Sequence, residues 1–215
     1  MAGDKTGNAY ASTKARLVLG ELVLNTGSRQ EFVQSLSRVG QIPGHPVLAL
    51  LAGRLYARGH ADAEAQQLLG LIQELLTVRP TAQLRSFQAL VRSELALAQH
   101  QQSAVQLAES AVGYENSTIA LETLARAYVA VGRNEDAVRV YERLLTRVNE
   151  RVVAYDAPAF HEVVDIHYQV GALYQKTQQA DRARAHLQTF LRYWSAADPS
   201  LAPYADAQTR LNAVR

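Results

Sequence analysis

The sequence contains no cysteine. A disulfide framework, a thiolate metal site and a cysteine nucleophile are therefore all excluded. No stretch approaches the roughly 18 consecutive apolar residues that a transmembrane helix needs. Residues 1–16 also lack the apolar segment of a signal peptide. We therefore expect a cytoplasmic protein, and a periplasmic one only if the native chain is longer and carries a signal peptide.

The sequence also lacks the short motifs of common catalytic sites: G-x-S-x-G, the P-loop and G-x-G-x-x-G are all missing. The stretch HEVVD, from His161 to Asp165, begins like the zinc motif H-E-x-x-H. However, Asp165 replaces the second histidine, and His167 lies off that face of a helix. No pair of carboxylates stands out from ordinary helix-surface charge. We predict a non-enzymatic protein without a metal or a cofactor.

Neither sign of charge predominates. Lysine and arginine together number 22, against 20 acidic residues, which gives a formal charge of +2. Acidic and basic residues alternate along the chain, as in Glu135, Asp136 and Arg139. A nucleic-acid-binding protein usually gathers its basic residues on one face, so we do not expect a nucleic-acid partner. The apolar content of 48% is typical of a globular chain.

Alternation of apolar and polar residues, the pattern of a strand, is almost absent. Apolar residues instead recur every three or four positions, which is typical of helices. One such stripe precedes Gly132 (Leu121, Leu124, Tyr128) and a second follows it (Ala137, Tyr141, Leu144). The best strand candidate, RVVAY at 151–155, is interpreted as the tail of a long helix. The sequence therefore predicts an all-α fold.

Two segments resemble each other: LARAYVAVGRNEDAVRVYERLL at 124–145 and VGALYQKTQQADRARAHLQTFL at 170–191. Each begins with a pair like Leu-Gly, then a tyrosine, then an alanine in the next helix, as in the tetratricopeptide repeat. The matching residues are Leu124-Ala125, Tyr128, Ala137 and Tyr141 in the first segment, and Val170-Gly171, Tyr174, Ala183, Leu187 and Phe190 in the second. The chain thus resembles a tetratricopeptide repeat protein. Weaker copies are proposed at Leu19-Gly20, at Leu51-Ala52 with Leu55, Gly59 and Ala65, and at Val91-Arg92 with Ala104.

This resemblance implies a right-handed α-α superhelix, in which each helix pair packs on the next. We expect a flexible N-terminus at 1–12 and a C-terminal capping helix at 201–215. Five helix pairs are expected between them, at about 13–44, 45–82, 85–117, 118–155 and 159–199. The last two copies lie further apart than the repeat length requires. We therefore expect a longer second helix in the fourth pair and a turn at 156–158.

In this family the first helices of successive pairs line a concave groove that takes a peptide or a helix. The resemblance implies a groove that includes Glu21, Asn25, Tyr56, Glu122, Arg126, Tyr168, Gln175 and Lys176. For Glu122 and Arg126 the alternative is an exposed i,i+4 ion pair worth about 0.2–0.5 kcal/mol. For Tyr56 and Tyr168 the alternative is packing against the adjacent helix.

The first predicted helix, ARLVLGELVLN, is apolar on nearly every side, through Leu17, Leu22 and Leu24 among others. Such a helix is normally buried. Either its own helix pair and the next pair cover it, or it forms an interface with an upstream domain, a second copy of the chain or another partner.

Near the C-terminus, the phrase formed by Phe190, Leu191, Trp194, Ala197, Asp198, Pro199 and Leu201 resembles the end of repeat arrays in bacterial multidomain signalling proteins. We expect a protein-interaction scaffold that binds a peptide or protein segment in its groove. The alternatives are a sensory or regulatory module of a bacterial kinase or transcription regulator, and an exported scaffold for envelope assembly.

Overall fold

The computed structural model describes residues 16–17, 19–20, 28–36, 46–147, 160–195 and 202–214, with the side chains of residues 29 and 160–163 excepted. Within these ranges every regular element is a helix and no strand occurs, which confirms the predicted all-α fold. The predictions for residues 1–12, for RVVAY and for the turn at 156–158 lie outside these ranges. The chain divides into two compact units, Met1–Asn116 (unit 1) and Ser117–Arg215 (unit 2).

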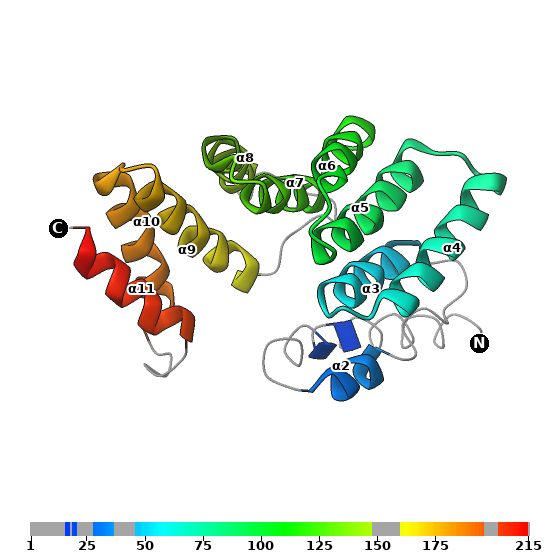
Figure 1. Ribbon diagram of the computed structural model, residues 1–215, viewed down its shortest axis with the longest axis horizontal. Coiled ribbons are helices and arrows are strands. Elements are labelled where there is room, and N and C mark those ends of the chain that lie inside the picture. The colour runs from blue at the N-terminus through cyan, green and yellow to red at the C-terminus, as the bar shows by residue number, and fades with distance from the viewer. Residues whose placement is uncertain are drawn as a thin grey trace, which may run out of the picture. The chain divides into compact units, whose positions relative to one another are not determined.

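The described part of unit 1 contains two helix pairs, preceded by a shorter helix and by the helical residues 16–17 and 19–20 (Figure 1). Its helices are α2 (Arg29–Leu36), α3 (Pro46–Arg58), α4 (Asp62–Val78), α5 (Ala82–Ala98) and α6 (Ser103–Tyr114). Helices α3 and α4 pack together, as do α5 and α6, and α5 also packs against both helices of the preceding pair.

Unit 2 contains two further helix pairs and a final helix, coloured from green to red in Figure 1. Its helices are α7 (Thr118–Ala130), α8 (Asn134–Arg147), α9 (Phe160–Lys176), α10 (Ala180–Tyr193) and α11 (Ala202–Ala213). Helix α9 meets the preceding pair mainly through α8, and α11 packs on α10 and on α9.

Two first helices begin at residues whose side chains cap them. The Thr81 hydroxyl accepts a hydrogen bond from the backbone N–H of Leu84 over 3.2 Å, at the start of α5. The Ser117 hydroxyl accepts one from the N–H of Ala120, also over 3.2 Å, at the start of α7. A side-chain oxygen in this position satisfies an N–H group that has no partner inside the helix.

The same turn joins the two helices of all four described pairs. One residue of each turn has a positive φ: His60 (55°), His100 (56°), Gly132 (77°) or Gln178 (60°). The N–H of the next residue bonds to a carbonyl five residues earlier, over 2.8–2.9 Å: Ala61 to Tyr56, Gln101 to Ala96, Arg133 to Tyr128, and Gln179 to Tyr174. This arrangement is the Schellman motif that commonly ends a helix. It gives a structural alignment of the four pairs.

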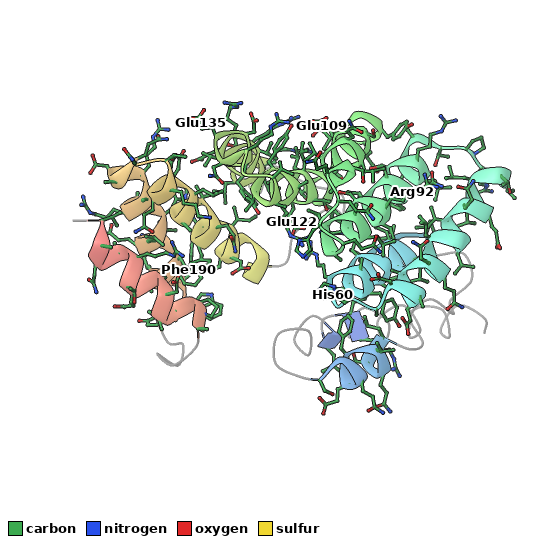
Figure 2. The ribbon with its side chains drawn as sticks, viewed as in Figure 1. His60, Arg92, Glu109, Glu122, Glu135 and Phe190 are labelled. Atoms are coloured by element: carbon green, nitrogen blue, oxygen red, sulfur yellow. The ribbon has the colours of Figure 1, made fainter. Side chains whose placement is uncertain are left out.

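The aligned turns correct the sequence register of two pairs. Tyr56 corresponds to Tyr128 and Tyr174, so the pair that opens the motif is Ala52-Gly53 and not Leu51-Ala52. The left-handed position belongs to His60 and not to Gly59. In the next pair the equivalent small residue is Ser93, which is fully buried, whereas Arg92 is exposed (Figure 2).

Small residues at these positions allow the helices to approach closely. A Cβ atom on Gly53 would lie 3.1 Å from Cγ2 of Val91, and one on Gly171 would lie 2.8 Å from Cγ of Leu187. Ala65, Ala137 and Ala183, at equivalent places in the second helices, are fully buried. Leu187 lies on α10, so Gly171 marks a close contact within one pair, whereas Val91 lies on α5, so Gly53 marks a close contact between neighbouring pairs. Each unit therefore has a glycine where two helices approach closely.

Candidate functional site

Tyr56 is the one predicted groove residue of unit 1 that the structure describes, and it is buried. Tyr56 is only 5% exposed, and its ring meets Phe32 of α2 edge-on, with centroids 6.0 Å apart. Burial, together with the nearby charge of Glu64, raises the pKa of Tyr56 to about 12. Tyr56 is therefore a core residue, which corrects the expectation that its ring faces a groove.

The N-terminal candidates can be placed only in part. Glu21, Leu22, Leu24 and Asn25 lie outside the described residues. Leu17 is buried within unit 1, at 6% exposure. Leu19, two residues further along, is 49% exposed, so the described part of this segment has one covered and one open leucine.

A buried ion cluster, which the sequence analysis missed, joins α3 to α5. Glu94 of α5 has a fully buried side chain. Its Oε1 atom accepts hydrogen bonds from Nη2 of Arg58 over 3.1 Å and from Nε of Arg54 over 3.4 Å. The sequence does contain a signal for this cluster, because Arg54 and Glu94 each interrupt an otherwise apolar helix stripe. Charged residues are rarely buried without a partner.

The aligned turns place the cluster on the same face as one predicted groove residue. Arg54, Glu94 and Arg126 each lie two positions before the residue that accepts the turn hydrogen bond. In unit 1 the ion cluster occupies this position on two first helices. In unit 2 the position belongs to Arg126 on α7, whose side chain is half-exposed.

Helix α7 presents a mixed face of apolar and charged side chains. Ile119, Glu122, Arg126 and Val129 follow one another at three- and four-residue spacing, so they share one side of the helix. All four are half-exposed, and Glu122 is labelled in Figure 2. We call these four residues the α7 face.

The corresponding side of α9 is covered by α11. The hydroxyl of Tyr168 donates to Oδ2 of Asp206 over 2.6 Å, and Nη1 of Arg210 donates to Oε1 of Gln175 over 2.9 Å. Burial, and then the bond to Asp206, raises the pKa of Tyr168. Lys176, at the end of α9, is exposed. Of the predicted groove residues on α9, the structure therefore brings two together under the final helix.

Aromatic packing anchors the helices beneath α11. Phe190 of α10, labelled in Figure 2, is fully buried. Its ring lies 5.3 Å from that of Tyr168 and 5.4 Å from that of Trp194, measured between centroids. On α11, Ala207 is fully buried. Phe190 of the C-terminal phrase thus belongs to the core of unit 2, Trp194 is half-buried beside it, and residues 197–201 lie outside the described ranges.

No group of three or more histidine, aspartate or glutamate residues is placed to hold a metal ion among the residues described. In the same ranges, none of the helices is long and apolar enough to cross a membrane. Comparisons with protein-family models and with curated proteins find no match to this sequence. The helix pairs and their exposed faces are therefore the features that bear on function.

Proposed function

We propose that the chain is a tetratricopeptide-like solenoid, a right-handed superhelix of helix pairs that serves as a protein-interaction scaffold. The support is the turn that recurs in all four described pairs, together with glycines at close helix contacts such as Gly53 and Gly171. A repeat that recurs in local structure, beyond what its sequence shows, is expected of a solenoid.

The binding surface that we propose is the α7 face, and this face is the single observation that carries the function. Half-exposed isoleucine and valine side chains flank an acidic and a basic residue. A partner segment gains from burying the apolar ends, while the two charges select its orientation and sequence. An extended peptide or a short amphipathic helix is the kind of partner that such a face accepts.

The remaining first-helix faces support this choice. In unit 1 the equivalent position is filled by the ion cluster of Arg54, Arg58 and Glu94. On α9 the predicted groove residues Tyr168 and Gln175 already bond to α11. Among the predicted groove positions that the structure describes, Glu122 and Arg126 are the pair that shares one half-exposed helix side with apolar neighbours.

The test is a selection of binders from a displayed library of random peptides, followed by affinity measurements on the full chain. The informative variant is the double charge swap Glu122→Arg with Arg126→Glu. Its control is Glu135→Arg with Arg139→Glu on α8, which makes the same swap at the same i,i+4 spacing at two exposed positions of a second helix.

We expect the selected peptides to lose at least about tenfold in affinity for the α7 variant, or 1.4 kcal/mol, and to bind the α8 variant like the wild type. Equal binding to both variants would remove the α7 face as the site. A library that yields no specific binder would argue against the scaffold function itself.

A further inference from the structure

A row of titratable side chains crosses the contact between three helices of unit 2. His167 on α9 and His186 on α10 face each other, with their Nδ1 atoms 3.1 Å apart. Nε2 of His186 lies 3.3 Å from Oε1 of Glu142 on α8. The hydroxyl of Tyr174, on α9, donates to the same carboxylate oxygen over 2.8 Å. We call these four connected side chains the histidine relay.

The hydrogen bonds fix where the protons lie when both imidazoles are neutral. Oε1 of Glu142 accepts a hydrogen bond from the Nε2–H group of His186, so Nδ1 of a neutral His186 carries no proton. Nδ1 of His167 must then carry the proton that joins the two rings. The neutral relay therefore has one direction of hydrogen bonding, from His167 to His186 and on to Glu142.

Adding protons to the pair has two distinct effects. After one added proton, one ring is an imidazolium and the other still has a bare Nδ1 atom, so the bond between the rings persists. After a second, both Nδ1 atoms carry a proton. The bond is then lost and two positive charges face each other at close range. The contact between α9 and α10 has to open to relieve them.

The surroundings disfavour protonation of both rings. Burial lowers the pKa of His167, and the charges of His186 and Arg192 lower it further, against an opposing effect of Glu142. Burial also lowers the pKa of His186, again opposed by Glu142. The unfolded chain, with the ordinary histidine pKa of 6.5, therefore binds these protons more readily than the folded chain does.

The other groups that face the relay come from the same three helices. Helix α8 and helix α9 contribute the relay members Glu142 and Tyr174, and beyond the relay the ring of Tyr193 on α10 lies 6.4 Å from that of His167. Helix α10 supplies Arg192 and Arg182, whose guanidinium carbon lies 5.5 Å from the centre of the Tyr174 ring. Glu142 thus balances the first added proton, whereas the guanidinium groups of α10 oppose the second.

Helix α11 packs on both α9 and α10. Its charged residues Asp206 and Arg210 bond to Tyr168 and Gln175 on α9. Arg184 of α10 also bonds to the carbonyl of Val214, just beyond α11. The position of α11 therefore depends on α9 and α10 staying together.

We propose that the histidine relay is a proton-sensitive lock that holds α10 and α11 on α9 near neutral pH and releases them in mild acid. Its contribution to stability is complete above pH 6.5, the unfolded value, and is lost as pH falls below it. Release uncovers Tyr168 and Gln175. The face of α9 then becomes available for binding in addition to the α7 face. Only this consequence rests on the proposed binding function.

Trp194 provides a local probe, because it is the single tryptophan of the sequence and stacks on the buried Phe190. We would record its fluorescence in the full chain from about pH 8 to about pH 5. The expected result is a red shift of the emission maximum below pH 6.5. The variant His167→Asn keeps an N–H donor toward His186 but cannot be protonated. It should move the midpoint of the shift down by at least about one pH unit.

The matched control is His100→Asn, an exposed histidine at a left-handed turn position that asparagine tolerates. It should leave the fluorescence profile of the wild type unchanged. Emission that does not change with pH, or an unaltered midpoint in His167→Asn, would overturn the proposal.

If His167→Asn does not fold, a second measurement on the wild-type protein tests the proton-sensitive lock. Nuclear magnetic resonance of the wild-type histidine rings should show His167 and His186 titrating together, in two steps, below pH 6.5. Independent titration of the two rings at the ordinary value would contradict the lock.

Discussion

Units 1 and 2 share one kind of helix pair but connect neighbouring pairs through different polar chemistry. In unit 1 a buried cluster of two arginines and a glutamate joins α3 to α5. In unit 2 a row of two histidines, a glutamate and a tyrosine joins α8, α9 and α10. Arginine stays charged at all pH values that folded proteins meet, whereas histidine changes its charge in mild acid. The turn within each pair is thus common to both units, whereas the polar contacts between pairs determine how each unit responds to pH.

The packing between pairs differs as well. In unit 1, α5 packs against both α3 and α4, and only residues 79–81 separate α4 from α5. In unit 2, α9 meets the preceding pair mainly through α8, and the residues between these two helices run from 148 to 159.

The largest effect should come from breaking the ion cluster of unit 1. Glu94→Ala leaves two buried guanidinium groups without this carboxylate, so we expect a loss of about 3–5 kcal/mol in the free energy of unfolding. Urea unfolding followed by circular dichroism measures it. Exposed Glu109→Ala on α6 is the control (Figure 2). A loss no greater than that of the control would show that the cluster does not stabilise unit 1.

A close helix contact in unit 2 should give the next largest effect. In Gly171→Ala the new Cβ would lie 2.8 Å from Cγ of Leu187 and 3.3 Å from its backbone nitrogen. Overpacking of this kind costs about 1–3 kcal/mol, which urea unfolding followed by Trp194 fluorescence can measure. Gly113→Ala on α6 meets no atom within 4 Å and should instead stabilise by about 0.5–1 kcal/mol. Equal effects of the two changes would contradict the role assigned to Gly171.

The caps provide a comparison in which the units should agree. Thr81→Ala and Ser117→Ala each remove one side-chain acceptor at a helix start. Each should cost about 1 kcal/mol of unfolding free energy, measured by thermal or urea unfolding. Thr81→Ser and Ser117→Thr should retain most of the stability. A loss in only one unit would show that the two starts are not equivalent.

The smallest effect at neutral pH is expected from Tyr56→Phe, which retains the buried ring. In alkali the two proteins should differ. The pKa of Tyr56 is raised to about 12, so its contribution is complete below pH 10, the unfolded value, and is lost as pH rises toward 12. Circular dichroism between pH 9 and pH 12 should show a steeper loss of stability in the wild type. Parallel curves would argue that the Tyr56 hydroxyl is not buried.

The sequence predicted the all-α fold because apolar residues recur at helical spacing throughout. It also aligned Tyr128 with Tyr174, and in the structure both residues accept the same turn hydrogen bond. In the second pair, Gly59 attracted the turn assignment because glycine favours a positive φ. In the structure His60 has the positive φ. At Gly59 a glycine is needed because of a close side-chain contact. A Cβ on Gly59 would lie 2.3 Å from the Phe32 ring.

The candidate sites were harder to predict because they depend on contacts between distant residues. Tyr56 and Tyr168 both looked like groove residues, yet one packs under Phe32 and the other under α11. The ion cluster and the histidine relay join residues that are far apart in the sequence, such as Arg54 with Glu94 and Glu142 with His186. Helical spacing shows which residues share a face, but it does not show which faces meet.

Hydrogen exchange read by mass spectrometry at pH 7.5 and pH 5.5, corrected for the intrinsic rates, would test the contrast between the units most directly. The account predicts that peptides from α9, α10 and α11 lose protection at the lower pH, while peptides from α3 and α5 keep theirs. Equal protection of the two regions at both values, or a greater loss in α3 and α5, would contradict it.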